Sequence, residues 1–397
     1  MNSGFYDIVV IGGGFSGLMA AITLADEGKR VAVVSRGNPV CCLSTGCIDV
    51  LSGHEDPIRG IAALPDEHPY HLAGEEATVR ALGMFSDIMA GANLPYMGDV
   101  HENRTIFTPL GTQKTTCLVP RSMESAHDHG DDYFHVVSFR GIKDFYPSYI
   151  MSRHARAGSS FYDAGVSATS AIAERFEDKT FLRKFISWLK GLDIPAGSIA
   201  IPAVLGTRSA PLIFDEISRE IQRRIFEIPT LPPSMPGQRL FSRLKNTFLA
   251  RGGSLYWGRD IASVERLGDQ IEAVTIASAG RPSRVQGKAF ILATGSFVSG
   301  GLYATMDGVK ETVFGLPTYL PDGRSTWFND SFFVPGHAIE KSGIRVDSTF
   351  RPLHAGWSNL FVCGSILAFS EVMKYGCGHG LAIATGVAAA TMCERQV

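Results

Sequence analysis

A glycine turn near the start of the chain constrains the fold more than any other feature. Residues 6–11, YDIVVI, form a short apolar run rich in β-branched residues and predict a strand. Gly12-x-Gly14-x-x-Gly17 follows directly, and a helical pattern comes after it. The run VAVVS at 31–35 predicts the next strand. This order predicts a βαβ unit at the start of a parallel sheet.

The spacing of these glycines is the fingerprint of a dinucleotide site. Gly12 permits a tight turn, Gly14 lets the backbone approach a pyrophosphate, and Gly17 lets the helix pack closely on the strand. Phe15 and Ser16 open the helix, whose first N–H groups carry partial positive charge. A tight turn without a ligand is the alternative, but the flanking strand and helix favour the dinucleotide site.

The end of the second strand bears on which dinucleotide binds. An acidic side chain is expected there to contact the ribose, but Ser35 and Arg36 stand at this position. Because an arginine accommodates a 2′-phosphate, an NADP-dependent reductase is one alternative. The strand end ILATG at 291–295 and the closing NLFVCG…GCGHGLA segment are similar to the later cofactor contacts of flavoproteins with two dinucleotide domains. Three glycine segments together favour FAD.

Two later segments therefore complete the predicted cofactor site. The helix that begins near His379 is expected to point its N-terminus at the flavin, where negative charge develops on reduction. The contacts predicted outside the first βαβ unit are Ile261, Ala293, Thr294, Gly295, Gly364, Ser365, Gly378, His379, Gly380 and Leu381.

The loop LSTGCIDVLSG, 43–53, offers small residues for close contact with a flat cofactor. Ser44, Thr45 and Gly46 supply hydroxyls and bare backbone for its polar edge. The nearby cysteines, Cys41, Cys42 and Cys47, match no zinc or cluster spacing. Thiol redox chemistry is the alternative, and small, half-buried filling beside a cofactor is favoured over it.

Length and composition predict two domains and exclude several classes of protein. The chain has 397 residues and a formal net charge of −2, so electrostatics favour neither nucleic acid nor an anionic membrane. No run of 18 apolar residues occurs, and the apolar N-terminus lacks the basic region of a signal peptide. Seven cysteines without framework spacing indicate reduced thiols in a cytosolic protein.

The expected architecture is α/β, a two-dinucleotide-domain Rossmann-like fold. The FAD-binding domain is discontinuous, at 1–60 and 237–397. An α+β cap domain, 61–236, is inserted, and the proline cluster IPTLPPSMPG at 228–237 is its return linker. Strands are expected around 254–264 and 270–277.

Several motifs together resemble the B subunit of the anaerobic glycerol-3-phosphate dehydrogenase family. The resemblance extends over nearly the whole length. It is carried by IGGGFSGL, VVSRG, STGCIDVL, FRGIKDFYP (139–147), LPPSMPGQRL (231–240), FRPLHAG (350–356) and NLFVCGSILA (359–368).

This resemblance implies a complex that oxidises sn-glycerol 3-phosphate to dihydroxyacetone phosphate and passes electrons to quinone. The implied partners are a second, catalytic flavoprotein subunit and an iron–sulfur subunit that anchors the complex at the membrane. The chain would then be cytoplasmic and peripheral to the inner face of the cell membrane. The family implies FMN in some members, whereas the glycine segments here favour FAD.

Oxidation of the alcohol group of glycerol 3-phosphate needs a base for the hydroxyl proton and cations that hold the substrate's phosphate. His379 is the first candidate for a base or a partner of reduced flavin, and His354 is the second. Arg121, Lys143 and Arg351 lie in the family-like motifs and are the candidate phosphate ligands. Ordinary surface cations and turn histidines are the alternatives.

Other interpretations of the chain stay open. The segment HDHGDD at 127–132 is expected to be a solvated loop, so no metal site is predicted. The partner flavoprotein could hold the substrate while this chain relays electrons. A free-standing FAD oxidoreductase of a small acid or alcohol, similar to fumarate reductase, and an assembly subunit with a structural flavin are the rival functions.

Overall fold

The structure is a computed structural model, and it divides into two compact units. It describes residues 4–127, 133–277, 282–331 and 333–397. The first unit comprises Met1–Val40, Asp49–Ile88 and Leu244–Val397. The second unit comprises Cys41–Ile48 and Met89–Arg243.

These units differ from the predicted domains in three segments, 41–48, 61–88 and 237–243. Residues 61–88 are predicted to belong to the inserted domain, but helix α3 (Pro69–Ala73) packs against the C-terminal helix α11 (Gly378–Glu394) of the first unit. Residues 41–48 are predicted to belong to the cofactor domain, but Cys47 lies in a hydrophobic core of the second unit. Residues 237–243 are predicted to belong to the cofactor domain, but they fall in the second unit. The differences come from long-range packing, which local sequence patterns do not report.

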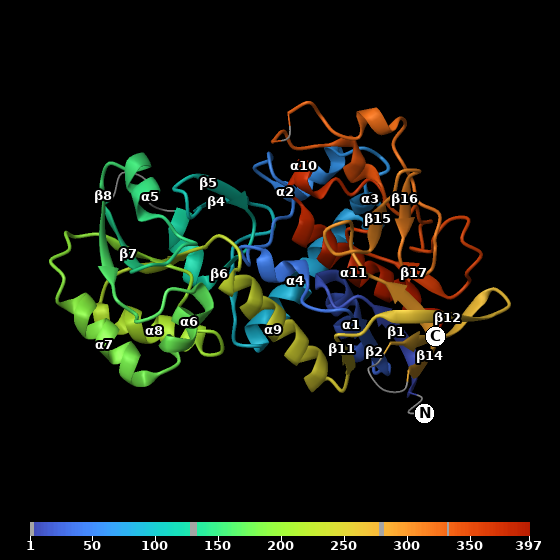
Figure 1. Cartoon of the computed structure of the whole chain (residues 1–397), viewed down its shortest axis with the longest axis horizontal. Helices are drawn as coiled ribbons and strands as arrows, with labels where there is room; N and C mark the ends of the chain where they lie inside the picture. The colour runs from blue at the N-terminus through green and yellow to red at the C-terminus, as the bar shows by residue number, and fades with distance from the viewer. Residues whose placement is uncertain (1–3, 128–132, 278–281, 332) are drawn as a thin grey trace. The chain divides into compact units, whose positions relative to one another are not determined.

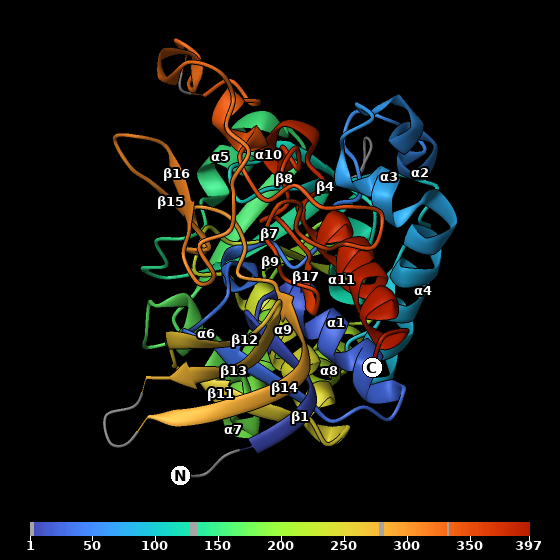
Figure 2. The ribbon, with the colours of Figure 1, turned by 90° about the vertical axis from the view of Figure 1, so that its right-hand side faces the viewer.

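The first unit is built on a sheet with the strand order β11-β2-β1-β14-β13-β12, in which β17 also pairs with β14 (Figure 2). β2 and β14 each pair in parallel with β1, and β17 pairs in parallel with β14. The carboxyl ends of these four strands therefore share one edge of the sheet. The bounds are β1 Gly4–Ile11, β2 Val31–Ser35, β11 Ser254–Trp257, β12 Ile261–Leu267, β13 Gln270–Ile276, β14 Ser283–Leu292 and β17 Leu360–Val362. The α/β prediction is confirmed, and the first βαβ unit has the predicted strands.

One predicted strand, 254–264, is wrong, because the chain forms two strands there. β11 pairs with β2, whereas β12 pairs with β13 on the far side of the sheet. Gly258, at a φ of 68°, lies in the connection between them. The residues 258–260 therefore turn at the carboxyl ends of β2 and β11.

Helix α1 (Phe15–Asp26) packs against α11, and Figure 1 shows the two helices beside the sheet. Most of α1 is buried, which explains its apolar composition on all sides. The helices approach closely because α11 carries small residues. A Cβ at Gly386 would lie 2.6 Å from the carbonyl oxygen of Ser16.

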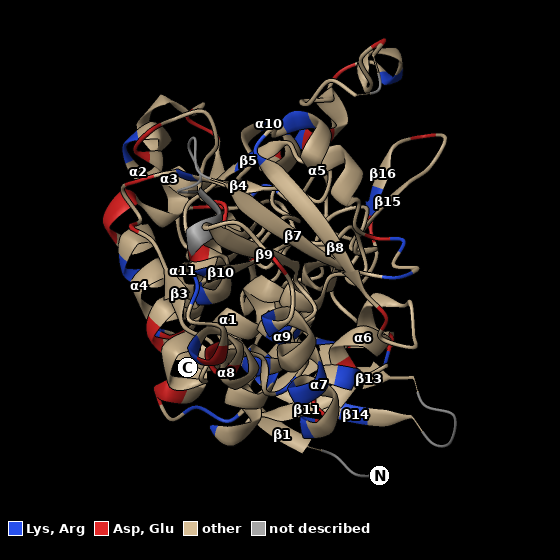
Figure 3. Ribbon diagram, turned by 90° about the vertical axis from the view of Figure 1, so that its left-hand side faces the viewer, with Lys and Arg blue, Asp and Glu red and all other residues tan. Residues whose placement is uncertain are grey.

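The second unit contains a sheet in the order β10-β9-β7-β8, and every pairing in it is parallel (Figure 3). Helices connect its strands, so this inserted part is α/β and not the predicted α+β arrangement. Parallel strands need helical crossovers, and all six residues of β7 are buried, as that arrangement requires. The elements are β7 Phe134–Phe139, α5 Pro147–Arg153, β8 Ala157–Tyr162, α6 Thr169–Phe176, α7 Lys179–Lys190, β9 Ser198–Pro202, α8 Ala210–Ile221 and β10 Ile225–Ile228.

Further elements complete the fold. Those in or bordering the second unit are β3 Tyr96–Met97, β4 Arg104–Phe107, β5 Gln113–Thr116, β6 Val119–Pro120, the 3₁₀ helix η3 Arg121–His127, and α9 Met235–Ala250. The others are α2 Pro57–Gly60, α4 Glu75–Gly91, β15 Leu302–Ala304, β16 Val309–Glu311 and α10 Val372–Tyr375. Of the helices in the described ranges, none is both long and apolar enough to cross a bilayer.

Candidate functional site

Two of the fingerprint glycines are required by the backbone of the first unit itself. Gly12 has a φ of +118°, and a Cβ there would clash with the carbonyl group of Ala293 at the end of β14. A Cβ at Gly17 would clash with the carbonyl oxygen of Gly12. These two glycines therefore shape the turn and the approach of α1 to the sheet.

Gly14 is different, because nothing in the described protein explains it. Its φ of −77° and ψ of −172° suit any residue, and a Cβ there would meet no atom within 4 Å. Gly14 is also the N-cap of α1, and no side chain of the described residues caps that helix. Free space at Gly14 beside an uncapped helix N-terminus leaves room for a pyrophosphate. The residues of this turn therefore fit a bound dinucleotide.

The glycine segment after β14 meets this turn. The backbone N–H of Ala293 donates to the carbonyl of Ile11 at 2.8 Å. The hydroxyl of Thr294 is buried and has no hydrogen-bond partner among the described residues. A buried hydroxyl without a partner at this edge is a second feature that fits a bound polar group.

The segment after β17 joins the same edge. The N–H of Gly364 donates to the Thr385 hydroxyl at 3.0 Å, and a Cβ at Gly364 would clash with the side chain of Ser16. A Cβ at Gly295 would lie 3.5 Å from the Ser365 hydroxyl. The three glycine segments predicted to bind the cofactor therefore lie together within the first unit.

The start of α11 completes this group through Phe15. The His379 ring lies edge-on to the Phe15 ring with 4.9 Å between centroids, and His379 is half-buried. The Gly380 N–H donates to the carbonyl of Asp49 at 2.9 Å, and a Cβ at Gly380 would crowd the hydroxyl of Tyr70. Gly378 and Leu381 belong to the same first turn of α11, which has no side-chain cap among the described residues.

Ser35 and Arg36 end β2 on the same edge, and a carboxylate faces them. Arg36 forms an ion pair with Asp260, which lies just before Ile261 and β12. The backbone N–H of Arg259 donates to the Ser35 carbonyl at 2.9 Å. Sequence reasoning misses Asp260, because 224 residues separate it from Arg36 and no local motif marks it.

The loop with Ser44, Thr45 and Gly46 belongs to the second unit. Its hydroxyls make local contacts: Ser44 donates to the Cys41 carbonyl at 2.8 Å and accepts from the Gly46 N–H at 3.2 Å. A hydrogen bond with the Cys42 thiol is the main cause that raises the pKa of Cys41 well above its ordinary value, and burial is the second cause. A thiol of this kind stays protonated, which disfavours thiol redox chemistry in the loop.

Two predicted catalytic residues, Arg351 and His354, lie in the segment that precedes β17. The Phe350 carbonyl accepts from the Val362 N–H at 2.9 Å, so Arg351 follows a residue that lies beside the carboxyl end of β17. The Arg351 guanidinium lies 5.7 Å from the centroid of the Phe361 ring, and His354 is exposed. The Arg351 Nε is buried and has no hydrogen-bond partner among the described residues, so Arg351 stays a candidate beside this edge.

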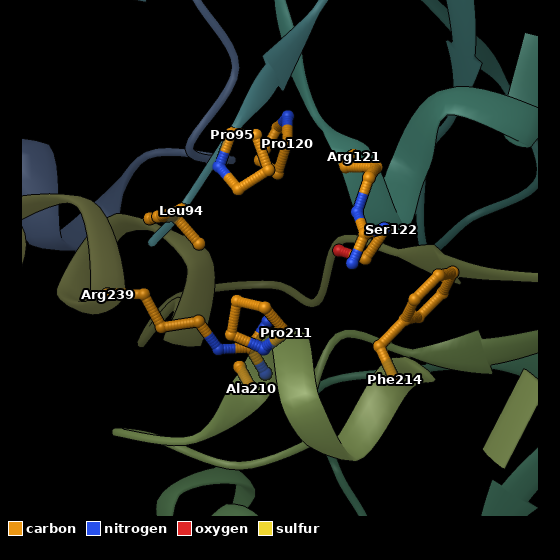
Figure 4. A pocket seen from close by; sticks show the side chains of 9 residues that line it. All are labelled: Leu94, Pro95, Pro120, Arg121, Ser122, Ala210, Pro211, Phe214 and Arg239. Atoms are coloured by element: carbon orange, nitrogen blue, oxygen red, sulfur yellow. The ribbon is translucent and has the colours of Figure 1, made fainter. Parts of the chain in front are cut away.

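Arg121 and Lys143 belong to the second unit. Arg121 forms an ion pair with Asp215 at 2.6 Å and reaches toward a small cavity (Figure 4), whereas Lys143 is exposed after β7. The cavity has a volume of about 20 Å³, room for one or two water molecules, which is too small for a phosphorylated polyol. It is lined by Leu94, Pro95, Pro120, Arg121, Ser122, Ala210, Pro211, Phe214 and Arg239.

The second cation at this cavity is neutralised inside the protein. Arg239 and Glu227 form a bidentate pair at 2.7 and 3.2 Å, with 4% and 1% of their side chains exposed. Ser122 donates to Glu227 at 2.7 Å, and the Leu205 N–H donates to it at 3.0 Å. This buried pair is satisfied by its own unit, so the cavity carries no excess positive charge for an anion.

The segment HDHGDD lies mostly outside the residues that the structure describes. Residues 128–132 are among those not described, so the candidate metal ligands of this segment are not placed. Among the residues that are described, no group of three His, Cys, Asp or Glu side chains could hold a metal ion.

Comparisons with known proteins show which proteins this chain is similar to. The sequence matches the protein family described as FAD binding domain over residues 7–381. It is similar to proteins named as the B subunit of anaerobic glycerol-3-phosphate dehydrogenase. The relative from Vibrio vulnificus is 29% identical over 97% of this chain and 95% of its own length. The relative from Yersinia enterocolitica is 28% identical over 96% of both chains.

Solved structures with related folds are more distant. FrdA of the E. coli quinol fumarate reductase is 9% identical, with a TM-score of 0.47 over 100% of this chain and 71% of that one. The 3-ketosteroid delta1-dehydrogenase of Sterolibacterium denitrificans is 12% identical, with a TM-score of 0.47 over 99% of this chain and 100% of that one.

Proposed function

Because the chain belongs to the FAD binding domain family, we propose that it is the FAD-carrying B subunit of an anaerobic glycerol-3-phosphate dehydrogenase complex. The cofactor is FAD. In this proposal the complex oxidises sn-glycerol 3-phosphate to dihydroxyacetone phosphate. Electrons leave through the flavin of this chain to an iron–sulfur partner and then to quinone, and that partner holds the chain at the inner face of the cell membrane.

The observation that carries the proposal is similarity along the whole chain to relatives with that name. Three of them are 29%, 28% and 27% identical, and each match covers at least 96% of this chain. A match that extends through both units supports a shared role and not only a shared cofactor fold. The grouping of the three glycine segments around an uncapped α1 supports FAD in the first unit.

Among the predicted catalytic residues of the first unit, His379 has the most structural support. We propose His379 as the base or as the group that stabilises negative charge on the reduced flavin, because it lies at the start of α11 beside Phe15. Arg351 follows a residue beside the carboxyl end of β17 and stays a candidate phosphate ligand, whereas His354 is exposed. The cavity at Arg121 is too small for a phosphorylated polyol, which favours a division of labour in which the partner flavoprotein holds the substrate and this chain relays electrons.

Exposed apolar side chains in the first unit support a role within a larger complex. Phe333 is 91% exposed and Met306 is 82% exposed, and large exposed apolar side chains are common at protein interfaces. The segment that carries Phe333 approaches α10, since Gly336 lies against the Lys374 side chain (Figure 2). The other large exposed apolar residues of this region are Val298, Tyr303, Phe328, Val334 and Met373.

The test begins with the purified chain and its partners. We expect a yellow protein that releases FAD, little dye-linked oxidation of glycerol 3-phosphate by the chain alone, and restored turnover when the partner flavoprotein is added. The Gly14→Val variant in the same complex is the control for dependence on this chain's flavin. Turnover by the chain alone would favour a free-standing oxidoreductase. A complex that stays fully active with Gly14→Val would favour an assembly role.

A further inference from the structure

The end of β2 lacks the carboxylate that a dinucleotide fold normally places there. In such folds an acidic residue at this position accepts hydrogen bonds from the adenosine ribose. The chain has Ser35 and Arg36 instead. The adenosine half of FAD would therefore lose one of its main polar contacts, unless another part of the first unit supplies it.

The structure brings a carboxylate to this position from a distant segment. β11 pairs in parallel with β2, and Trp257 lies opposite Ser35, so both strands end at the same edge. The chain turns at Gly258 and places Asp260 beside Arg36, with 2.5 Å between its Oδ1 and the Arg36 Nε. Asp260 thus lies at the carboxyl end of β2 although it follows a different strand.

This pair lies beside the glycine turn that faces the pyrophosphate. A Cβ at Gly13 would lie 2.8 Å from the Ser35 side chain and 3.4 Å from the Trp257 ring. On its other side the Arg36 guanidinium is 3.2 Å from a Cβ placed at Gly300, in the loop that follows β14. Arg36 and Asp260 therefore lie next to the turn, beside the ends of β2 and β11, and Arg36 also approaches the loop that follows β14.

We propose that Asp260 is the ribose-binding carboxylate of this protein and that Arg36 is a positioning residue that holds it. A carboxylate has acceptor sites on two oxygens, so one bond from Arg36 leaves acceptors for ribose hydroxyls. The negative charge of Asp260 also opposes a 2′-phosphate and neutralises Arg36, which disfavours NADP. The inference rests on FAD as the cofactor and not on the substrate proposed above.

The proposal is tested by binding of FAD, FMN and ADP to the apoprotein, followed by fluorescence or calorimetry. FMN lacks the adenosine half, and ADP carries it without a flavin. For Asp260→Ala we expect the Kd of FAD and of ADP to rise roughly 10- to 100-fold, the range for loss of hydrogen bonds to a charged group, while the Kd of FMN stays unchanged. Arg36→Ala should cause a smaller rise for the same two ligands.

Asp307→Asn, at an exposed aspartate of the same unit, is the matched control and should leave all three constants unchanged. Arg36 and Asp260 have 68% and 56% of their side chains exposed, so the variants should fold, and the apoprotein Tm verifies this. Unchanged FAD and ADP binding in Asp260→Ala would overturn the proposal, because the pair would then be a surface ion pair alone. An equal loss for FMN would also overturn it, since the effect would not be specific to the ribose.

Discussion

The two units each contain parallel strands followed by helices, but they differ in how the helix N-termini at the carboxyl edges of their sheets are capped. In the first unit, α1 begins at Gly14 with no side-chain cap in the described structure, and the space in front of it is open. In the second unit, the backbone N–H groups of Thr207, Arg208 and Ser209 lead into α8, and all three donate to Glu177, at 2.7, 2.7 and 3.0 Å.

This difference distinguishes two kinds of sheet edge. At the binding edge, in the first unit, no side chain of the described residues caps the helix N-terminus, whereas at the structural edge, in the second unit, the protein's own carboxylates satisfy the N–H groups. A helix N-terminus attracts an anion only when its N–H groups are not already satisfied. The second unit provides its own carboxylates, Glu177 at α8 and Glu227 at Arg239. In the proposed site of the first unit, the pyrophosphate of FAD takes this role. The same α/β architecture therefore binds a cofactor in one unit and stabilises itself in the other.

The largest expected effect comes from Gly14→Val, which challenges the binding edge directly. Gly14 has an unstrained backbone, and a Cβ added there meets no atom of the described residues within 4 Å, so the apoprotein should fold and keep its Tm. The valine side chain would occupy the pyrophosphate space, and FAD affinity should fall by roughly 100-fold or more, because charge-assisted hydrogen bonds are lost. The measurement is the visible spectrum after gel filtration, together with the apoprotein Tm.

Gly12→Val is the matched control for that variant. Gly12 has a φ of +118° and faces the carbonyl of Ala293, so this variant should fail to fold and not merely lose FAD. A yellow Gly14→Val protein would contradict the assignment of this edge to the cofactor.

The next effect concerns the structural edge of the second unit. Arg239→Met should destabilise that unit by about 3 kcal/mol, because Glu227 is left buried without its cation. Hydrogen exchange of the β9 and β10 amides measures the loss, since it reports the free energy of local opening. Adding Glu227→Leu in the same chain should recover part of the stability. A single variant with unchanged exchange would show that the pair contributes nothing.

A smaller effect is expected for the carboxylate at α8, and it depends on pH. Burial opposes the charge on Glu177, but the N–H groups of Ser209, Thr207 and Arg208 outweigh it and lower its pKa from 4.5 to about 2. Its stabilisation is therefore complete above pH 4.5 and is lost as the pH falls toward 2. Glu177→Gln should cost about 2 kcal/mol at pH 7.

Urea denaturation of both proteins between pH 2 and 7 tests this prediction. The difference in unfolding free energy between wild type and Glu177→Gln should shrink as the pH falls below 4.5. Glu220→Gln is the control, because Glu220 lies near the end of α8 and pairs with Lys190 at the surface. A difference that is independent of pH would show that the Glu177 charge is not what stabilises α8.

The first βαβ unit could be predicted because its signals are local. The apolar run at 31–35 forms β2 as predicted, and the glycine turn stands between β1 and α1. The parallel sheet of the second unit could not be predicted so readily, since β8 has the sequence AGSSFY and no apolar run. Its position at the edge of the sheet leaves it half-buried, so small polar residues suffice there.

The proposed cofactor contacts divide in the same way. Gly12, Gly14 and Gly17 are found by spacing alone, whereas the place of Asp260 depends on which strand pairs with β2. The break between β11 and β12 has the same cause, because these neighbouring segments pair with opposite sides of the sheet. A single sequence does not reveal strand pairing at long range, and this pairing places Asp260 beside Arg36, where we propose that the adenosine of FAD binds.

The smallest predicted effect is that of His379, and it tests whether the edge of the first unit performs chemistry as well as binding. His379→Gln keeps a polar side chain at the start of α11, so FAD should remain bound. Flavin reduction in the assembled complex should slow by about tenfold and lose part of its pH dependence, as expected for removal of a titrating group. Stopped-flow absorbance across pH 6–9 measures both quantities. His354→Gln is the matched control, because the His354 side chain is exposed in the segment that precedes β17, and this variant should change neither. Equal rates in both variants would reduce His379 to a packing partner of Phe15, and the edge would then only hold the cofactor.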